Sequence, residues 1–280
     1  MGQSERTHRM SGSKVVLVTG ASSGIGQATA LELIKAGYTV YGGARRVDAM
    51  APLVDAGGKA LSLDVTDDAS MVAAVDAIIA AEGKIDALVN NAGYGSYGAV
   101  EDVPMNEGRR QLEVNVFGLA RMTQLVLPHM REARSGRIIN ISSIGGTVWT
   151  PLGAWYHGTK WFVEGFTNAM RFEVEPFGIK MIIVAPGLID TGFSGGVADT
   201  LGKTSMEGPY SELAGKLSAS SNDPSSWSQP VVIAKAIRQA LGDRKPKTLY
   251  RAGAMSRLLP FLARTLPNRW FDRLVMSQLR

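Results

Sequence analysis

The sequence predicts a doubly wound α/β fold: a parallel sheet of about seven strands flanked by helices, in one domain with a C-terminal helical extension. Two observations carry this prediction. Short runs rich in Val and Ile alternate with longer stretches of helical spacing, which is typical of a parallel sheet covered on both faces. The 280 residues, 45% hydrophobic and 20% charged, also suit one large globular domain.

The elements follow in order along the chain. A strand is expected at 14–19, and the helix after it at 24–36, where Ile25, Ala28 and Leu31 recur at roughly helical spacing. Further strands are expected at 38–43, 59–63, 85–90, 137–141, 179–185 and 247–251. Helices are expected at 67–81, 105–132, 155–175 and 230–241, the first with acids at its N-terminus.

Residues 188–228 break this alternation because they are rich in Gly and Ser. A connection of that length in a compact domain is usually functional or disordered, so the segment is expected to be a lid over a substrate. Residues 1–13 are polar and are expected to be a disordered tail. Because they lack a hydrophobic signal region, and no apolar run is long enough to cross a bilayer, a cytoplasmic protein is expected.

Composition excludes several kinds of chemistry. The chain has no cysteine, which rules out disulfides, thiolate metal sites and cysteine nucleophiles. Its three histidines, His8, His129 and His157, are too few and too far apart for a multi-histidine site, so no metal is predicted.

The net charge of +5 is unevenly distributed. Nine of the 30 Lys and Arg residues, but only one acid, lie in residues 244–280, so the remaining chain is slightly acidic. A nucleic-acid partner is therefore not expected, since the excess charge is confined to a tail that is interleaved with apolar side chains.

The first strand leads into a glycine-rich turn and then a helix. The turn carries Gly20, Gly24 and Gly26 in the spacing G-x-x-x-G-x-G. Glycine permits a tight turn and lets the backbone approach a pyrophosphate, which the free N–H groups of the helix N-terminus then bind. This context indicates a dinucleotide-binding loop.

The second strand ends in Arg45 and Arg46, with no acid between positions 38 and 47. Loops that bind NAD usually place Asp or Glu here to hold the ribose 2′-hydroxyl, whereas two arginines suit a 2′-phosphate. The charge favours NADP over NAD, and two solvated arginines are the alternative.

Tyr156 and Lys160 lie four residues apart in a helical stretch, which puts both side chains on one face. A cationic lysine near a phenol favours the phenolate, so the pKa of Tyr156 is expected to be lowered and the residue to exchange protons with a carbonyl or alcohol. His157 would point away from Tyr156 and is expected to be structural.

Several ordered motifs now add to these features. They are TGASSGIG at 19–26, Asp64-Val65, Asn90-Asn91-Ala92-Gly93, Asn115, Ile141-Ser142-Ser143, Tyr156-His157-Gly158-Thr159-Lys160 and Pro186-Gly187 followed by Thr191. In this set and order the sequence resembles the short-chain dehydrogenase/reductase family, in its compact one-domain form with a Rossmann-type sheet. The only departure is Thr159, where Ser is commoner.

The resemblance implies a catalytic tetrad. Tyr156 would be the general acid in carbonyl reduction and the base in alcohol oxidation, and Lys160 would bind the nicotinamide ribose and tune Tyr156. Ser143, rather than its neighbour Ser142, would hydrogen-bond the substrate oxygen, and Asn115 would hold a water in a proton relay to Lys160.

The resemblance also implies an NADP site in residues 14–251. Asp64 and Val65 would contact the adenine, Asn91 and Gly93 the adenosine side, and Thr191 the nicotinamide carboxamide or the phosphates. Besides Tyr156 and Lys160, the full set expected to contact the cofactor is Gly20, Ser22, Ser23, Gly24, Ile25, Gly26, Arg45, Arg46, Asp64, Val65, Asn91, Ala92, Gly93, Pro186, Gly187 and Thr191.

Two other functions compete with an oxidoreductase. The segments 20–24 and 192–196 both match G-x-S-x-G, the nucleophile turn of α/β-hydrolases. No histidine follows the second, and the first leaves Tyr156, Lys160 and the two arginines unexplained. A non-catalytic NADP-binding redox sensor would need the glycine loop but not the tetrad.

The substrate is expected to be a small-molecule carbonyl compound or alcohol, apolar or bulky, because aromatic residues surround the motifs. Besides Ser143, the expected lining is Tyr94, Tyr97, Trp149, Trp155 and Phe193.

The extension at 252–280 is expected to be amphipathic, with Asn268 capping a helix that carries Trp270 and Phe271. It is similar to extensions in steroid- and retinol-dehydrogenase-like branches. Packing over the pocket, a subunit contact or peripheral attachment to an acidic membrane are the alternatives, the first two being preferred. The family also implies a homo-oligomer, a dimer or tetramer.

Overall fold

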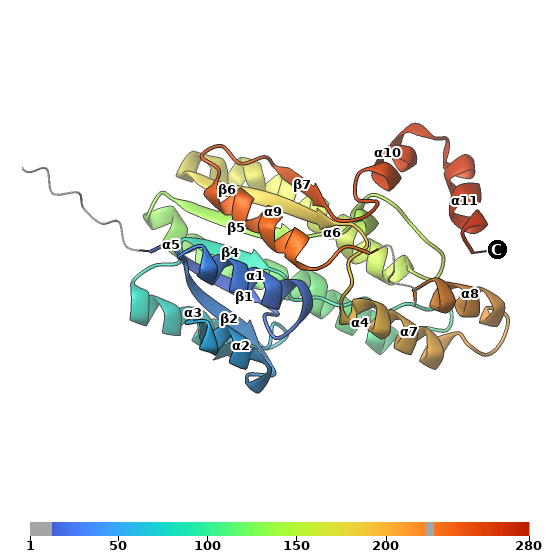
Figure 1. Ribbon diagram of the computed structural model, residues 1–280, viewed down its shortest axis with the longest axis horizontal. Helices are drawn as coiled ribbons and strands as arrows, with labels where there is room; N and C mark the ends of the chain where they lie inside the picture. The colour runs from blue at the N-terminus through green and yellow to red at the C-terminus, as the bar shows by residue number, and fades with distance from the viewer. Residues whose placement is uncertain (1–12, 222–226, 280) are drawn as a thin grey trace, which may run out of the picture.

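The computed structural model describes residues 13–221 and 227–279. Seven parallel strands form one sheet in the order β3-β2-β1-β4-β5-β6-β7 (Figure 1). The strands are β1 (Val15–Thr19), β2 (Thr39–Ala44), β3 (Lys59–Ser62), β4 (Ala87–Asn90), β5 (Gly136–Ile141), β6 (Ile179–Pro186) and β7 (Leu249–Ala252). The predicted doubly wound α/β fold is confirmed.

Helices cover both faces of the sheet. On one face lie α1 (Gly24–Lys35), α2 (Ala51–Asp55) and α9 (Val231–Gly242), and on the other α3 (Asp68–Glu82), α5 (Leu119–Glu132) and α6 (Ala154–Val174). Successive strand residues supply the two cores in turn, because strand side chains alternate between faces. Thus Val16 and Val18 pack under α1 and α9, whereas Val15 and Leu17 pack under α3, α5 and α6.

The strand order places a binding crevice. The chain runs outward from β1 through β2 to β3, and then crosses to β4 on the other side of β1. Ligands of such sheets bind at the carboxyl ends of the strands where this reversal occurs. The glycine turn after β1 and the Asn91–Gly93 segment after β4 lie at that edge.

The segment at 188–228 is more regular than its composition predicts. It contains α7 (Gly192–Thr204), whose N-cap Thr191 accepts a hydrogen bond from the Phe193 amide, and α8 (Ser211–Ser221). Val197 and Leu201, one turn apart on α7, are buried in one cluster with Leu217 of α8, which stabilises helices that Gly and Ser alone disfavour.

The extension forms two helices, α10 (Leu258–Thr265) and α11 (Asn268–Ser277), at one end of the molecule (Figure 1). The expected cap at Asn268 is wrong: Pro267 occupies the N-cap position, and Asn268 is the first helical residue. Proline suits the start of a helix because its fixed φ is compatible and the missing N–H would have no partner there.

The expected tail at 1–13 lies almost wholly outside the described residues, which begin at residue 13. Among the helices that the structure describes, none is both long and apolar enough to cross a bilayer.

Candidate active site

The turn after β1 is built for close backbone packing. Gly20 has a φ of +68°, a conformation that favours glycine, and a Cβ there would lie 2.9 Å from Cα of Ala92. A Cβ on Gly26 would overlap the carbonyl oxygen of Gly20. The glycines therefore allow the start of α1 to lie directly against the segment that follows β4.

Hydrogen bonds tie this turn to the end of β4. The hydroxyl of Thr19 accepts from the amides of Asn91 and Ala92, both at 3.0 Å. The Asn91 side-chain amide donates to the carbonyl oxygens of Thr19, at 2.9 Å, and Gly20, at 3.3 Å. Asn91 thus shapes the wall of the crevice. Thr19, which was not among the predicted site residues, accepts its hydrogen bonds.

The N-terminus of α1 fits an anionic group. Ser23 stands at the N-cap in an extended conformation without a side-chain capping bond, and the first turn carries no acid. The amides of this turn and the helix dipole therefore face the crevice at the end of β1. Their chemistry fits the pyrophosphate of a dinucleotide.

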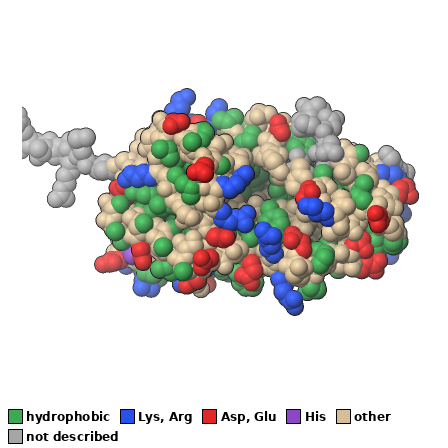
Figure 2. Space-filling view, turned by 90° about the horizontal axis from the view of Figure 1, so that it is seen from below, with side chains coloured by type: hydrophobic (Ala, Val, Ile, Leu, Met, Phe, Trp, Pro, Cys, Tyr) green, Lys and Arg blue, Asp and Glu red, His purple; other side chains and the backbone are tan. Residues whose placement is uncertain are grey.

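Arg45 and Arg46 are exposed just beyond the end of β2. Burial acts to raise the pKa of Asp64, but hydrogen bonds from Thr66 and the nearby charges of Arg45 and Arg110 lower it. Arg45 therefore lies near Asp64, where the resemblance puts the adenosine. Figure 2 shows several Lys and Arg side chains around a hollow on this molecule's surface.

The structure brings Ser143, Tyr156 and Lys160 together. Tyr156 and Lys160 are 7% and 8% exposed on α6, and the lysine Nζ lies 5.8 Å from the centre of the tyrosine ring. The Lys160 ammonium donates to the carbonyl oxygen of Ile141 at 2.9 Å, at the end of β5. Ser143 hydrogen-bonds the Tyr156 phenol.

Ser142 points elsewhere. Its hydroxyl is 3.1 Å from Oε1 of Glu164, which lies four residues beyond Lys160 on α6. Ser143 therefore reaches Tyr156, while Ser142 anchors the turn to α6. Glu164 was not predicted, although its spacing from Lys160 places it on the same helix face.

Asn115 lies in η2 (Glu113–Gly118), a single turn of π-helix between α4 (Met105–Leu112) and α5. Such turns often occur at functional sites. The Asn115 amide donates to the Tyr94 carbonyl at 2.8 Å and to the Thr159 hydroxyl at 3.2 Å. Thr159 in turn donates to the Tyr156 carbonyl at 2.8 Å. Thr159, the residue that differs from the usual Ser of the family, therefore connects Asn115 to α6.

Burial has the largest effect on the pKa values of Tyr156 and Lys160. It raises the pKa of Tyr156 to about 12, although the bond from Ser143 acts in the opposite direction. Burial also lowers the pKa of Lys160 to about 8. The expected lowering of the Tyr156 pKa is therefore wrong for this structure, because the cost of removing the phenolate from water outweighs the hydrogen bond from Ser143. Near neutral pH the phenol keeps its proton.

His157 does not point away from Tyr156 as expected, because the two rings meet edge to face with their centres 5.9 Å apart. Its Nε2 accepts from the Thr150 amide at 3.0 Å, and its Nδ1 lies 3.1 Å from the Gly145 carbonyl oxygen. The ring therefore ties the loop before α6 to the turn after Ser143.

Apolar side chains surround the phenol. Tyr97 and Phe193 lie against it, with ring centres 5.7 and 5.1 Å from that of Tyr156. Leu201, Leu217 and Leu279 extend the same buried cluster, so that α7, α8 and the C-terminal residues all meet beside Tyr156. The site is apolar on this side.

The other predicted lining residues are dispersed. Tyr94 donates from its hydroxyl to Glu107 at 2.9 Å, and Trp155 packs its ring on Gly108 of α4. The Trp149 indole donates to Asp272 of α11 at 2.8 Å. The structure therefore places Phe193 and Tyr97, but not these three rings, directly on the Tyr156 ring.

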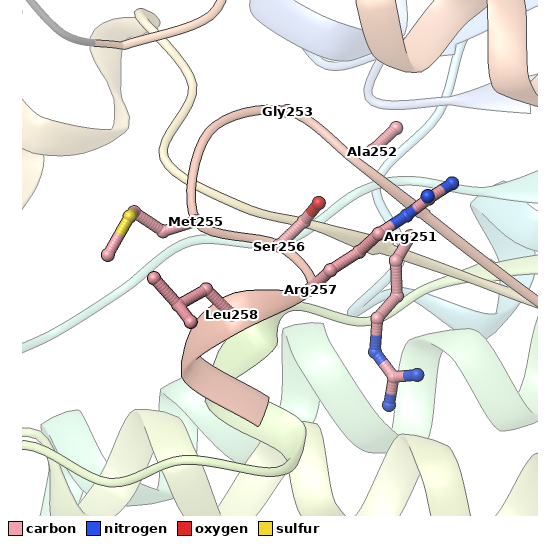
Figure 3. Close-up of a pocket in the computed structure, with 7 residues that line it drawn as sticks. All are labelled: Arg251, Ala252, Gly253, Met255, Ser256, Arg257 and Leu258. Atoms are coloured by element: carbon pink, nitrogen blue, oxygen red, sulfur yellow. The ribbon is translucent and has the colours of Figure 1, made fainter. Parts of the chain in front are cut away.

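A cavity of about 440 Å³ lies at the turn between β7 and α10 (Figure 3). It is lined by Arg251, Ala252, Gly253, Met255, Ser256, Arg257 and Leu258. None of these residues belongs to the predicted tetrad or cofactor set. In the part of the chain that the structure describes, no three His, Asp or Glu side chains group as metal ligands.

A family model described as short chain dehydrogenase matches residues 14–201. The chain belongs to this family of oxidoreductases. It is 32% identical over 267 residues to a probable short-chain type dehydrogenase/reductase, VdlC, of Helicobacter pylori, covering 93% of this chain and 96% of the relative. It is 44% identical over 181 residues to a 3-ketodihydrosphingosine reductase of Bacteroides thetaiotaomicron, covering 65% of this chain and 66% of that protein.

Solved structures agree with this assignment. A short-chain dehydrogenase from Streptomyces avermitilis is 40% identical, with a TM-score of 0.76 and coverage of 85% of this chain and 87% of that one. Nicotinamide cofactors accompany two others. A serine dehydrogenase complexed with NADP+ is 25% identical, with a TM-score of 0.76. The match covers 87% of this chain and 96% of the serine dehydrogenase chain. A 3-ketoacyl-(acyl-carrier-protein) reductase from Brucella melitensis complexed with NADH is 27% identical, with a TM-score of 0.71. The match covers 84% of this chain and 94% of that one.

Proposed function

We propose that this protein is an NADP(H)-dependent oxidoreductase that interconverts a carbonyl compound and the corresponding alcohol. The observation that carries the proposal is the meeting of Ser143, Tyr156 and Lys160 beside the carboxyl end of β5. The NADP preference is supported by Arg45 and Arg46 and by the lack of an acid at the end of β2.

The bound nicotinamide would supply or accept the hydride. In reduction, Tyr156 donates its phenolic proton to the carbonyl oxygen, which Ser143 also holds by a hydrogen bond. Lys160 stabilises the phenolate that this proton transfer leaves, and Asn115 fixes the helix that carries both residues through Thr159. In oxidation the same groups act in reverse.

The test is a panel of aldehydes, ketones and alcohols followed at the nicotinamide absorbance with each cofactor. We expect apolar or bulky substrates to react best, because Tyr97, Leu152, Val197 and Phe193 surround the phenol. Turnover of such a compound with NADPH supports the proposal. Cofactor binding without turnover of any tested class would instead favour a redox sensor, and ester hydrolysis without cofactor would favour a hydrolase.

The pH dependence follows from the two buried groups. Lys160 loses its charge as the pH rises through about 8, so the rate of reduction should be level at neutral pH and decline above that value. Oxidation needs the phenolate of Tyr156, whose pKa is about 12, so its rate should rise with pH. Steady-state profiles in both directions measure this. In Lys160→Arg the residual reduction should lack the decline near pH 8, and a decline that persists would contradict the assignment.

We also propose that residues 14–251 form the cofactor-binding domain and that 188–228 act as a substrate lid. Phe193 at the start of α7 lies on Tyr156 and fills the space beside Gly95, so a substrate needs α7 to move. Hydrogen exchange in the described part of 188–228 should slow when cofactor and substrate analogue bind together. Equal exchange in the free and ligated protein would count against a lid.

A homo-oligomer is supported by an exposed apolar face on η2 and α6. Phe117, Trp161 and Phe172 are 56%, 51% and 74% exposed there. Large exposed apolar side chains gathered on one face mark interaction surfaces. The mass of the protein in solution, measured by light scattering, decides between a dimer, a tetramer and a monomer.

A further inference from the structure

The outer faces of α10 and α11 combine apolar and cationic side chains. On and just before α10, Met255, Leu258 and Phe261 are 41%, 50% and 61% exposed. On α11, Trp270 and Met276 are 62% and 43% exposed. We call these five residues the tail face. Side chains of this size exposed together at one end of a protein indicate a surface that something else covers.

The opposite faces of both helices are buried in one cluster. Phe271 of α11 is 1% exposed and packs edge-on against Trp149, with ring centres 5.0 Å apart. Leu259 and Leu262 of α10 pack in the same cluster as Leu274 of α11. The two helices are therefore fixed on the body by their inner sides, and the tail face is the outside of one projection (Figure 1).

The apolar and cationic groups are segregated at the start of α10. Figure 3 shows Met255 and Leu258 directed to one side of the turn, while the side chains of Arg251 and Arg257 leave on the other. Met255 has a φ of +59°, which is unfavourable for a side chain that is not glycine. A long apolar residue is thus held outward in a strained conformation.

Arginines border the tail face. Arg257, the N-cap residue of α10, and Arg264, near its end and close to Glu164 of the body, are exposed about two helical turns apart, and Arg269 and Arg273 are exposed on α11. The guanidinium of Arg273 lies 5.8 Å from the centre of the Trp270 ring. The only acid of the two helices, Asp272, accepts a hydrogen bond from the Trp149 indole, and the four arginines outnumber it, so the border carries a net positive charge.

We propose that the tail face binds the surface of an anionic lipid bilayer as a peripheral contact. An amphipathic helix lies in such an interface with its apolar side chains among the lipids and its arginines at the phosphates. A second copy of the chain fits poorly, because a two-fold contact would bring identical arginines together. Nucleic acid would use the arginines and Trp270 but leave Met255, Leu258 and Met276 without partners.

The test is co-sedimentation of the full-length protein with phosphatidylcholine vesicles, with and without about one-third phosphatidylglycerol. Binding is expected only to the anionic vesicles and should weaken with salt. The variant Arg269→Gln/Arg273→Gln should bind about 25-fold more weakly, at roughly fivefold for each arginine. The control Lys235→Gln/Arg244→Gln removes the same charge from exposed positions on and after α9 and should bind like the unchanged protein.

Phe261→Ser tests the apolar part and should reduce binding by about tenfold. Its exposed position means that folding should persist, which thermal unfolding and cofactor affinity verify. Equal binding to neutral vesicles, no binding, or equal losses in the charge variant and its control would overturn the proposal. So would a dimer that Phe261→Ser dissociates, or an oligonucleotide that outcompetes the vesicles. Each of these tests measures binding rather than turnover, so the membrane proposal is tested independently of the proposed catalysis.

Discussion

Replacing Tyr156 with Phe is expected to lower the rate of carbonyl reduction by about 100- to 10,000-fold, the usual contribution of a positioned acid. The substitution removes one oxygen from a side chain that is 7% exposed, and the ring can keep its contacts with Tyr97 and Phe193. Cofactor affinity should stay within about threefold, because only one hydroxyl among the many expected cofactor contacts is removed and the ring keeps its place. Stopped-flow or steady-state rates, with cofactor titration, measure both quantities.

Tyr97→Phe is the matched control for this substitution. It removes the same oxygen from a neighbouring buried ring, whose pKa is also raised by burial, and Tyr97 has no role in the proposed proton transfer. A small loss in the control and a large loss in Tyr156→Phe assign the proton transfer to Tyr156. If the two variants keep similar turnover, Tyr156 is not the acid.

Arg45→Asp is expected to reverse the cofactor preference. Loss of a charge-assisted hydrogen bond to the 2′-phosphate should weaken NADPH by about 10- to 100-fold, and the new carboxylate repels that phosphate. The same carboxylate can accept the ribose 2′-hydroxyl of NADH, so NADH should bind as well or better. Dissociation constants from the quenching of tryptophan fluorescence give the ratio.

Arg244→Asp makes the same charge change at an exposed position before β7, at the opposite end of the sheet from the crevice. It should leave the ratio of the two dissociation constants unchanged. Should both variants shift that ratio equally, the effect is general electrostatics and Arg45 does not hold the phosphate.

The sheet could be predicted because its signal is local. Val15 to Val18 form a fully buried strand, and their apolar run identifies a strand buried on both faces. The helices α7 and α8 could not be predicted, since their residues favour loops and Val197, Leu201 and Leu217 gain their burial from distant side chains. Secondary structure that depends on tertiary packing leaves little trace in composition.

The site shows the same division. Tyr156 and Lys160 are four residues apart, so their shared face is readable from the chain. The bond from Asn115 to Thr159 spans 44 residues, and that from Ser142 to Glu164 spans 22. No sequence spacing specifies such contacts. The raised pKa of Tyr156 cannot be predicted from the sequence, because the spacing to Lys160 is visible there but the depth of burial is not.

Leu279, 8% exposed, packs in the cluster that holds the Tyr156 ring. A side chain beyond α11 thus shares one buried cluster with the reactive phenol. Shortening it, as in Leu279→Ala, should therefore alter the kinetics while leaving the sheet intact, so activities are comparable only between preparations in which this region is unaltered.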